Sequence, residues 1–445
     1  MDAVRTWLPR SFALAALALY LAIAPVGLSL PSAVEAATLA TTLGVPAPLA
    51  AALSPLVAML GKAAALLPLG PLPYRLALVS AICAGLAVLW TMRLCLLLAP
   101  ESDRHALVGA ATTGALLALS AVFVRQATML SVAAPMVALM AGGLLLIGRV
   151  AGGGDARWGL GLALVCGLGL ATGAQFWLVA GPALALCGVR FYRGARWPLL
   201  APLVMIGAAV SAYGYVPVRA QALSSDTAAD TAPVTLSALT QHLDAGPAPT
   251  LSPTLTVDVG TLGDRVELVA DHLGPFAPLA ALFGLVVLLR QRRHRWLGAA
   301  LLVLGAGDAI GVLWLYPEQL IAWRAGAPLA LAVALWAGLG IAALSRWMQL
   351  AGPFVAAVAA LIMVAPVALV SLSAVAKGAE RAAAGTGRAL AEEALEGAPS
   401  RISDAPGAQL LAPLVRYLRA VEGARPDLDE SGTPSSADHE TTPDP

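Results

Sequence analysis

Long runs of apolar residues, rather than an alternation of apolar and polar positions, organise this chain. Runs close to the roughly 20 residues that a membrane-spanning helix needs recur up to about residue 375. We expect about eleven spans, of which the segment 177–189 is the shortest. They are expected at 11–30, 76–98, 106–124, 131–148, 159–175, 177–189, 199–216, 275–289, 296–316, 325–344 and 354–373. The pattern therefore predicts an all-α polytopic membrane protein.

The segments between and after the spans define the expected domain organisation. Residues 1–375 form a transmembrane domain with external loops at 31–75 and 219–274. Within the first loop, prolines bracket an apolar stretch that Lys62 interrupts, so we expect a half-buried interfacial helix there. Residues 376–428 form an external tail with one amphipathic helix at 408–421, and the acidic residues 429–445 are expected to be disordered.

Composition and charge support a membrane location and an orientation. The 445 residues are 59% hydrophobic and 12% charged, whereas soluble proteins carry about 25% charge. A net charge of +1 removes any electrostatic case for nucleic acid binding. More than half of the 27 Lys and Arg residues fall in loops on one side, which the positive-inside rule assigns to the cytoplasm together with the N-terminus. The tail is then external, or periplasmic in a Gram-negative bacterium.

Two acidic residues are the first candidates for chemistry. Glu35 lies just outside the first span in a loop without Lys or Arg, where a carboxylate can act as a base on a hydroxyl or bind a metal. Its position alone is equally that of a solvated loop acid. Asp308 lies inside an apolar span, where an ionisable group faces a polar interior or a partner. The alternative for Asp308 is a hydrogen-bonded packing contact between glycines.

Arginines at the outer ends of spans are candidates for phosphate binding. Arg125, next to Gln126, and Arg324, after Trp323, can each bind the phosphate of a lipid-linked donor or simply extend to the membrane interface. The four cysteines and five histidines show no metal-ligand spacing, and no phosphate-binding loop of the P-loop type occurs. No cofactor is evident from the residues.

Several short motifs together resemble one family. They are the stretch from Glu35 to Pro48, Leu60–Gly70 with its Leu-Leu-Pro-Leu-Gly ending, Tyr74-Arg75, Phe123–Ala127, and Tyr213–Arg219 with its Tyr-Gly-Tyr-Val-Pro-Val-Arg sequence. The chain resembles the protein O-mannosyltransferase-like family of polytopic membrane proteins, a bacterial family of the glycosyltransferase GT-C type. The resemblance covers most of residues 11–428 in short pieces.

The resemblance implies a fold, a donor and a site. It implies a GT-C-like bundle that takes a polyprenyl-phosphate sugar and transfers a hexose, mannose in this family, to a protein hydroxyl at the outer membrane face. Glu35 then serves as the catalytic acid, and Arg125, Arg219 or Arg324 lies near the donor phosphate. Membrane lipid, a lipid-linked sugar and a protein acceptor or partner subunit are the implied partners, and a divalent metal is left open.

The departures from the family pattern leave open whether the chain relies on Glu35 alone or has lost catalysis. The family's Asp-Ser-Gly-Glu reads Ser32–Glu35 here, its His-Pro-Pro-Gly-Tyr reads Ala47–Ala51, and its Glu-Val-Tyr reads Ser131–Ala133. Three rivals follow: an enzyme that relies on Glu35, a noncatalytic homologue that binds a lipid-linked sugar or scaffolds a partner, and a transporter built around Asp308. A transporter of that kind typically has two self-similar halves, which the sequence does not show.

Overall fold

The computed structural model describes an all-helical bundle. The described residues are 2–24, 37, 40–41, 54–99, 104–151, 156–172, 176, 180–185, 200–214, 277–291, 295–310, 319–347, 354, 358–362 and 364–369. The helices are α1 (Asp2–Ile23), α3 (Pro55–Ala65), α4 (Leu72–Leu98), α5 (Arg104–Leu119), α6 (Ala121–Ala127), α7 (Ala133–Ala151), α8 (Ala156–Ala171), α10 (Leu200–Tyr213), α14 (Ala277–Arg290), α15 (Arg295–Ile310) and α16 (Gln319–Trp347). The all-α fold class predicted from the apolar runs is confirmed.

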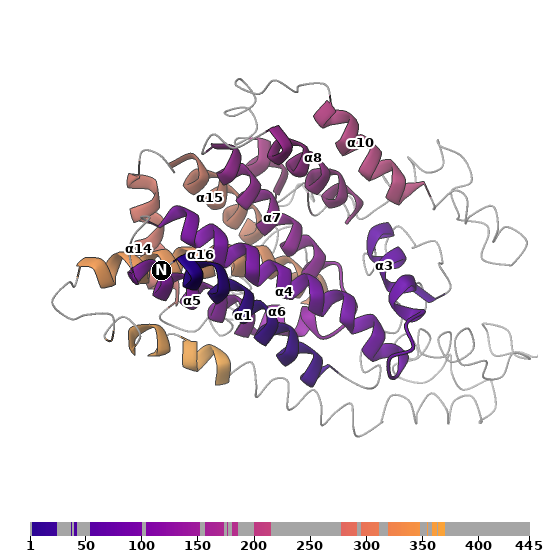
Figure 1. Cartoon of the computed structure of the whole chain (residues 1–445), viewed down its shortest axis with the longest axis horizontal. Coiled ribbons are helices and arrows are strands. Elements are labelled where there is room, and N and C mark those ends of the chain that lie inside the picture. The colour runs from indigo at the N-terminus through magenta and orange to yellow at the C-terminus, as the bar shows by residue number, and fades with distance from the viewer. Residues whose placement is uncertain are drawn as a thin grey trace, which may run out of the picture.

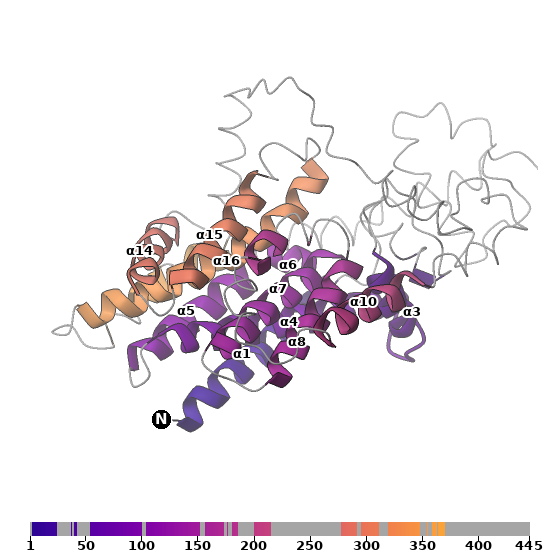
Figure 2. The same ribbon diagram turned by 90° about the horizontal axis from the view of Figure 1, so that it is seen from above.

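Helix α16 and helix α4 are the two main packing centres of the bundle. Helix α16 packs against α14, α5 and α15, whereas α4 packs against α7, α1 and α5. Helices α8 and α10 pair with each other beyond α7, on the side of the bundle away from α14 (Figures 1 and 2). The N-terminus and α3 lie at opposite ends of the bundle (Figure 1), and we call these the N-terminal end and the α3 end.

Several helices have the length and composition of membrane spans. Four described helices are long and apolar enough, at Ala3–Ile23, Leu72–Leu98, Ala133–Val150 and Gly326–Trp347, and the bent pair of α5 and α6 would make a fifth. Helices α10 and α14 are shorter and direct large apolar side chains outward, among them Leu203, Ile206, Leu279 and Leu282. Outward-facing apolar surface of this kind fits contact with lipid tails. The chain is a multi-pass integral membrane protein.

Glycines bring the central helices into close contact. A side chain at Gly109 of α5 would meet the carbonyl oxygen of Gly338 of α16 at 2.5 Å. A side chain at Gly284 of α14 would collide with the carbonyl oxygen of Trp336, and one at Gly340 with that of Ala280. In a membrane, lipid tails are as apolar as the side chains of a helix, so the burial of apolar surface does not drive two helices together. Close backbone packing through small residues stabilises such contacts instead. Helix α16 is thus held on two sides by glycine contacts.

Several expected spans differ from the helices observed, and α16, for example, begins at Gln319 instead of residue 325. Helix α1 begins at Asp2 instead of residue 11 and so includes Arg5 and Arg10. The expected span 106–124 is broken at Ser120 into α5 and α6, which meet at 64°. The Ser120 hydroxyl accepts a hydrogen bond from the Phe123 amide at 3.3 Å and caps α6, as serine does at helix N-termini.

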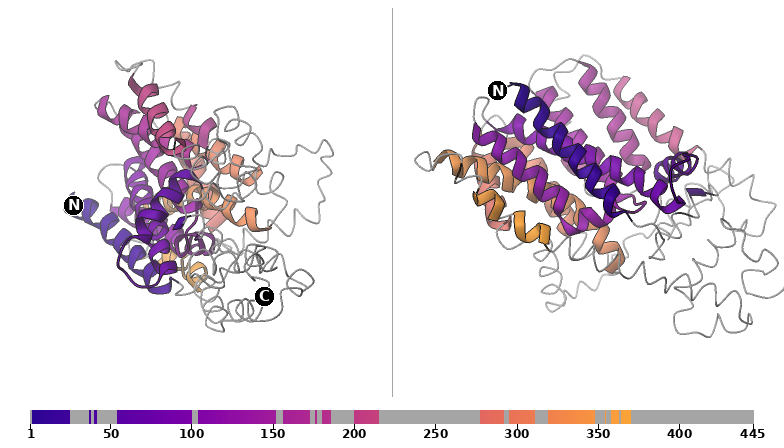
Figure 3. Two further views of the ribbon diagram at one scale, coloured as in Figure 1. Left: turned by 90° about the vertical axis from the view of Figure 1, so that its right-hand side faces the viewer. Right: turned by 60° about the horizontal axis from the view of Figure 1, so that its bottom comes forward.

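The buried side chain of Tyr20 on α1 contacts both helices at the break between α5 and α6. Its hydroxyl, on Tyr20, donates a hydrogen bond of 2.9 Å to the Ala118 carbonyl in the last turn of α5, and its ring contacts Phe123 edge-on. Carbonyls at a helix end lack partners within the helix. The side chain of Tyr20 therefore satisfies a polar group next to the bend, and it joins α1 to both α5 and α6. Helix α1, drawn in indigo, runs across the front of the bundle from the N-terminus (Figure 3, right).

Candidate functional site

The α3 end of the bundle holds Ala37, Ala40 and Thr41, which follow Glu35 in the sequence. Helix α3 begins at Ser54, whose hydroxyl caps it, with Pro55 in the first turn. One face of α3 is buried and carries Val57, Ala58 and Gly61, while Met59 and Leu60 are exposed. This is the half-buried helix that the interrupted apolar stretch predicts.

The residues just after Glu35 pack onto this helix. A side chain at Gly61 would meet Ala40 at 2.8 Å and Leu130 at 3.1 Å, so α3 lies between Ala40 and the segment after α6. The Thr41 hydroxyl donates to the Ala37 carbonyl at 2.8 Å, which is a helical hydrogen bond. The Lys62 ammonium donates to the Thr41 carbonyl at 2.5 Å. Glu35, two positions before Ala37, lies outside the described residues.

The basic residues of this loop have backbone partners. One guanidinium nitrogen of Arg75 donates to the Ala65 carbonyl at 2.5 Å and to the Leu67 carbonyl at 3.1 Å. These carbonyls lie at and just after the C-terminus of α3, where the helix dipole favours a cation. Lys62 and Arg75 thus hold α3 in place against the first loop and α4.

Helix α6 places Arg125 and Gln126 beyond the bend. Arg125 is partly buried in the last turn, and Gln126 is only 2% exposed. The Gln126 side-chain oxygen is buried without a hydrogen-bond partner among the described residues. A buried acceptor without a partner costs free energy, so Gln126 is suited to accept a hydrogen bond from a ligand. The sequence marks Gln126 only as the neighbour of Arg125, and nothing in its pattern signals the burial.

The segment after α6 is tied to α4. The Ser131 amide donates to the Ser80 hydroxyl of α4 at 3.1 Å, and the Ser131 hydroxyl donates to the Gln126 carbonyl at 3.0 Å. Both serines are buried. These hydrogen bonds fix the end of α6 and, with it, the positions of Arg125 and Gln126 relative to the bundle.

Two predicted phosphate-binding arginines lie on neighbouring helices. A side chain at Gly326 of α16 would meet Val122 of α6 at 4.0 Å. Arg324 precedes Gly326 by two residues, and Arg125 follows Val122 by three. The helices that carry Arg125 and Arg324, which are far apart in sequence, therefore converge. Arg219 lies outside the described residues.

Asp308 lies in the same region and has a definite partner. Its side chain is 1% exposed, and one carboxyl oxygen accepts a hydrogen bond of 2.8 Å from the Leu329 amide of α16. Leu329 follows Pro328, which sits inside α16. A proline inside a helix lacks an amide hydrogen and displaces a carbonyl of the preceding turn, so nearby backbone groups need other partners. The Asp308 carboxyl supplies one, and it links α15 to α16.

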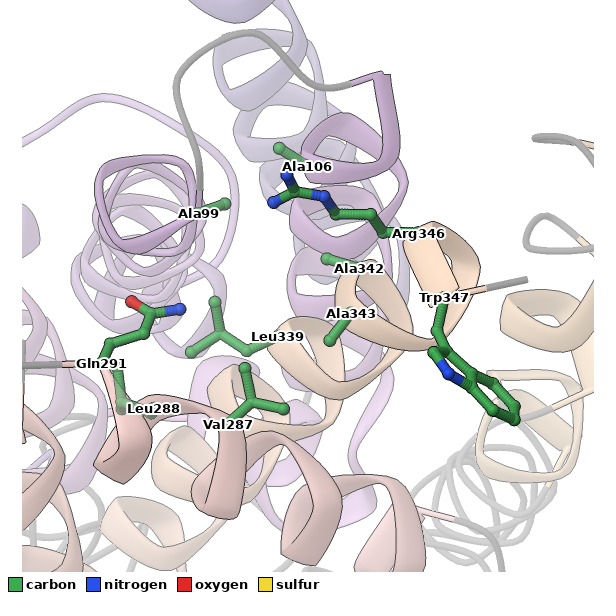
Figure 4. Close-up of a pocket in the computed structure, with 10 residues that line it drawn as sticks. All are labelled: Ala99, Ala106, Val287, Leu288, Gln291, Leu339, Ala342, Ala343, Arg346 and Trp347. Carbon is green, nitrogen blue, oxygen red and sulfur yellow. The ribbon is translucent and has the colours of Figure 1, made fainter. Parts of the chain in front are cut away.

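A hollow lies at the N-terminal end of the bundle. It has a volume of about 400 Å³ and is lined chiefly by apolar side chains where α4, α14 and α16 end. The polar lining groups are Gln291 and Arg346, and the Arg346 guanidinium lies near Ala106 while the Trp347 ring points away (Figure 4). Its position at the other end of the bundle separates it from α3 and α6.

The helical bundle has a GT-C-like fold. Among solved structures, the chain is similar to ArnT from Cupriavidus metallidurans bound to undecaprenyl phosphate, with a TM-score of 0.55 and 14% identity over 93% of this chain and 85% of ArnT. It is also similar to the Archaeoglobus fulgidus oligosaccharyltransferase tethered with an acceptor peptide containing the NVT sequon. That match has a TM-score of 0.50 and 12% identity over 85% of this chain and 56% of the other.

Sequence comparison adds nothing to this likeness. No protein-family model and no curated protein matches the chain. At 14% and 12% identity, the two structural matches establish the fold.

Proposed function

We propose that the chain is a membrane glycosyltransferase homologue that transfers a hexose from a polyprenyl-phosphate donor to a protein acceptor at the outer membrane face. The observation that carries this proposal is the match of 93% of the chain to ArnT, a protein whose structure holds undecaprenyl phosphate. The family resemblance of the sequence makes mannose the proposed sugar. The acceptor peptide in the oligosaccharyltransferase structure supports a protein acceptor.

The proposed chemistry uses one acid and a set of cations. The Glu35 carboxylate takes the proton of the acceptor hydroxyl as that oxygen bonds to the anomeric carbon. The bond from the anomeric carbon to the phosphate oxygen breaks, the configuration inverts, and the polyprenyl phosphate leaves. Arg125, Arg219 and Arg324 are proposed to stabilise the departing phosphate. The convergence of α6 and α16 supports this role for Arg125 and Arg324.

Replacing Glu35 tests the enzyme directly. Glu35→Gln is expected to lower transfer from polyprenyl-phosphate mannose to a peptide by at least about 100-fold, because loss of a general base removes a factor of this order. Expression and membrane insertion should not change. The assay uses purified protein in nanodiscs, with Glu267→Gln as the control because this acid lies in the other external loop. Full activity of Glu35→Gln would contradict the assigned role of Glu35.

The second candidate is a noncatalytic homologue that binds the lipid-linked sugar or scaffolds a partner. The loss of several polar motif positions, such as the family's histidine at the position of Ala47, favours it. Binding of polyprenyl-phosphate mannose without turnover in the wild-type protein would support this candidate over the enzyme. Absence of binding would overturn the donor assignment of both and leave the scaffold role.

A further inference from the structure

Arg93 lies within electrostatic range of two arginines on neighbouring helices, toward the N-terminal end of the bundle. Arg10 lies on α1, Arg93 on α4 and Arg149 in the last turn of α7. The electrostatic repulsion of both Arg10 and Arg149 acts on Arg93. We call these residues the arginine triad. Like charges at close range repel, and the repulsion grows when solvent is withdrawn.

The packing of the helices explains why the triad converges. The side chains of Phe12 and Met92 both reach Gly114, which brings α1 beside α4 within a turn of Arg10 and Arg93. On the other face of α4, a side chain at Gly148 would meet Leu97 at 2.5 Å. Since Gly148 precedes Arg149 directly, the end of α7 lies against the last turns of α4. The triad is a product of the helix packing and not of a single loop.

Two arginines of the triad have tryptophan neighbours. The Arg149 guanidinium lies 5.2 Å from the ring centre of Trp158, and that of Arg10 lies 5.2 Å from the ring centre of Trp7. The Trp7 ring is 64% exposed. Tryptophans are enriched at the height of lipid headgroups, so their position next to the triad indicates that the guanidinium groups lie at this height.

The acidic residues of the described part do not balance the triad. Among the described residues, only Asp2 and Asp308 are acidic. Asp308 binds the Leu329 amide between α15 and α16, and within the described part of the chain the charged groups that act on Arg93 are both cations. A mobile anion that entered this place would relieve the repulsion among three guanidinium groups.

We propose that the arginine triad binds the phosphate of an anionic phospholipid from the leaflet at the N-terminal end. Guanidinium groups bind phosphate with two parallel hydrogen bonds, and basic pockets between spanning helices on the cytoplasmic side recognise anionic headgroups. The lipid tails lie against the apolar helices. This site is separate from the donor site proposed at the α3 end, and its occupancy does not depend on the proposed transfer.

Native mass spectrometry of the full chain with defined lipids tests the site. The wild-type protein is expected to retain phosphatidylglycerol or cardiolipin in preference to phosphatidylcholine. The double variant Arg93→Gln, Arg149→Gln should bind the anionic lipid about 25-fold more weakly, at about fivefold for each cation removed. Arg295→Gln is the matched control because Arg295 also lies beside a tryptophan, Trp296, but outside the triad.

Two readouts separate lipid binding from other outcomes. Thermal unfolding of each variant in detergent shows whether it still folds, and anionic lipid should raise the unfolding temperature of the wild type more than that of the double variant. If inorganic phosphate alone stabilised the wild type as much as anionic lipid does, the ligand of the triad would be a soluble phosphate and not a lipid, which would overturn the proposal. Equal retention of anionic lipid by the wild type and a folded double variant, or no preference over phosphatidylcholine, would overturn the proposal.

Discussion

At the scale of single residues, the most informative contact is the one between Asp308 and Leu329. An acid inside an apolar span points to function in the sequence, because its burial is costly. The structure gives it the Leu329 amide as a partner, next to Pro328 in α16. The sequence shows an acid and a proline in two consecutive helices, which is what such a link needs. It does not show that the two residues pair, because the pairing depends on how α15 packs on α16.

Two substitutions test whether Asp308 stabilises the bundle through its hydrogen bond to Leu329. Asp308→Asn keeps a side-chain oxygen that can accept the Leu329 hydrogen bond, so we expect a small loss of stability. Asp308→Leu leaves the buried amide without a partner and should cost about 1–3 kcal/mol. Thermal unfolding in detergent micelles measures both. If Asn and Leu were equally destabilising, the hydrogen bond would not be the contribution that Asp308 makes.

At the scale of the helices, the length of the apolar runs predicts more than local polarity does. The expected span 76–98 corresponds closely to α4 (Leu72–Leu98), because an uninterrupted apolar run leaves one way to satisfy its backbone in lipid. The apolar pattern does not predict the break at Ser120, since a serine within an apolar run is compatible with a continuous helix. Only the cap on Phe123 and the hydrogen bond from Tyr20 to Ala118 identify it.

The glycine contacts of α16 give a prediction for helix packing. Gly284→Ala places a methyl group where the Trp336 carbonyl lies, so α14 and α16 must move apart. We expect a loss of stability of about 1–3 kcal/mol, the usual cost of overpacking. Gly207→Ala of α10 is the control because nothing lies within 4 Å of the position that its methyl group would take. If Gly284→Ala had the same melting temperature as the control, α14 and α16 would be able to move apart without loss of stability, which would contradict this prediction.

At the scale of the whole molecule, the sequence predicts class and architecture better than it predicts the site. The apolar runs indicate a polytopic membrane protein, and the ArnT likeness supports the GT-C-like fold. The site is harder because its members come from distant segments: the helices that carry Arg125 and Arg324 are brought together by the packing of α6 on α16, as at Val122 and Gly326. Glu35 and Arg219 stay predictions, since both lie outside the described residues.

The orientation of the bundle in the membrane is also a prediction. Under the positive-inside rule, the loop 219–274 faces outward and the end of α14 faces the cytoplasm. In a background with all four cysteines replaced by serine, Ala248→Cys should react with a membrane-impermeant maleimide in intact cells, whereas Gln291→Cys should react only after lysis. The reverse pattern would invert the topology and place the arginine triad at the outer leaflet.

The glycine contacts around α16 also limit how this protein can evolve. A side chain at Gly338 would collide with the Thr113 hydroxyl as well as the Gly109 carbonyl, so a larger residue there needs compensating changes on α5. Descendants of this sequence should therefore exchange residues at Gly338, Gly109 and Thr113 together, or keep all three. The same reasoning joins Gly284 to Gly340 across α14 and α16. Sequence change in the centre of the bundle is then paired, while the lipid-facing surfaces of α10 and α14 remain free to vary singly.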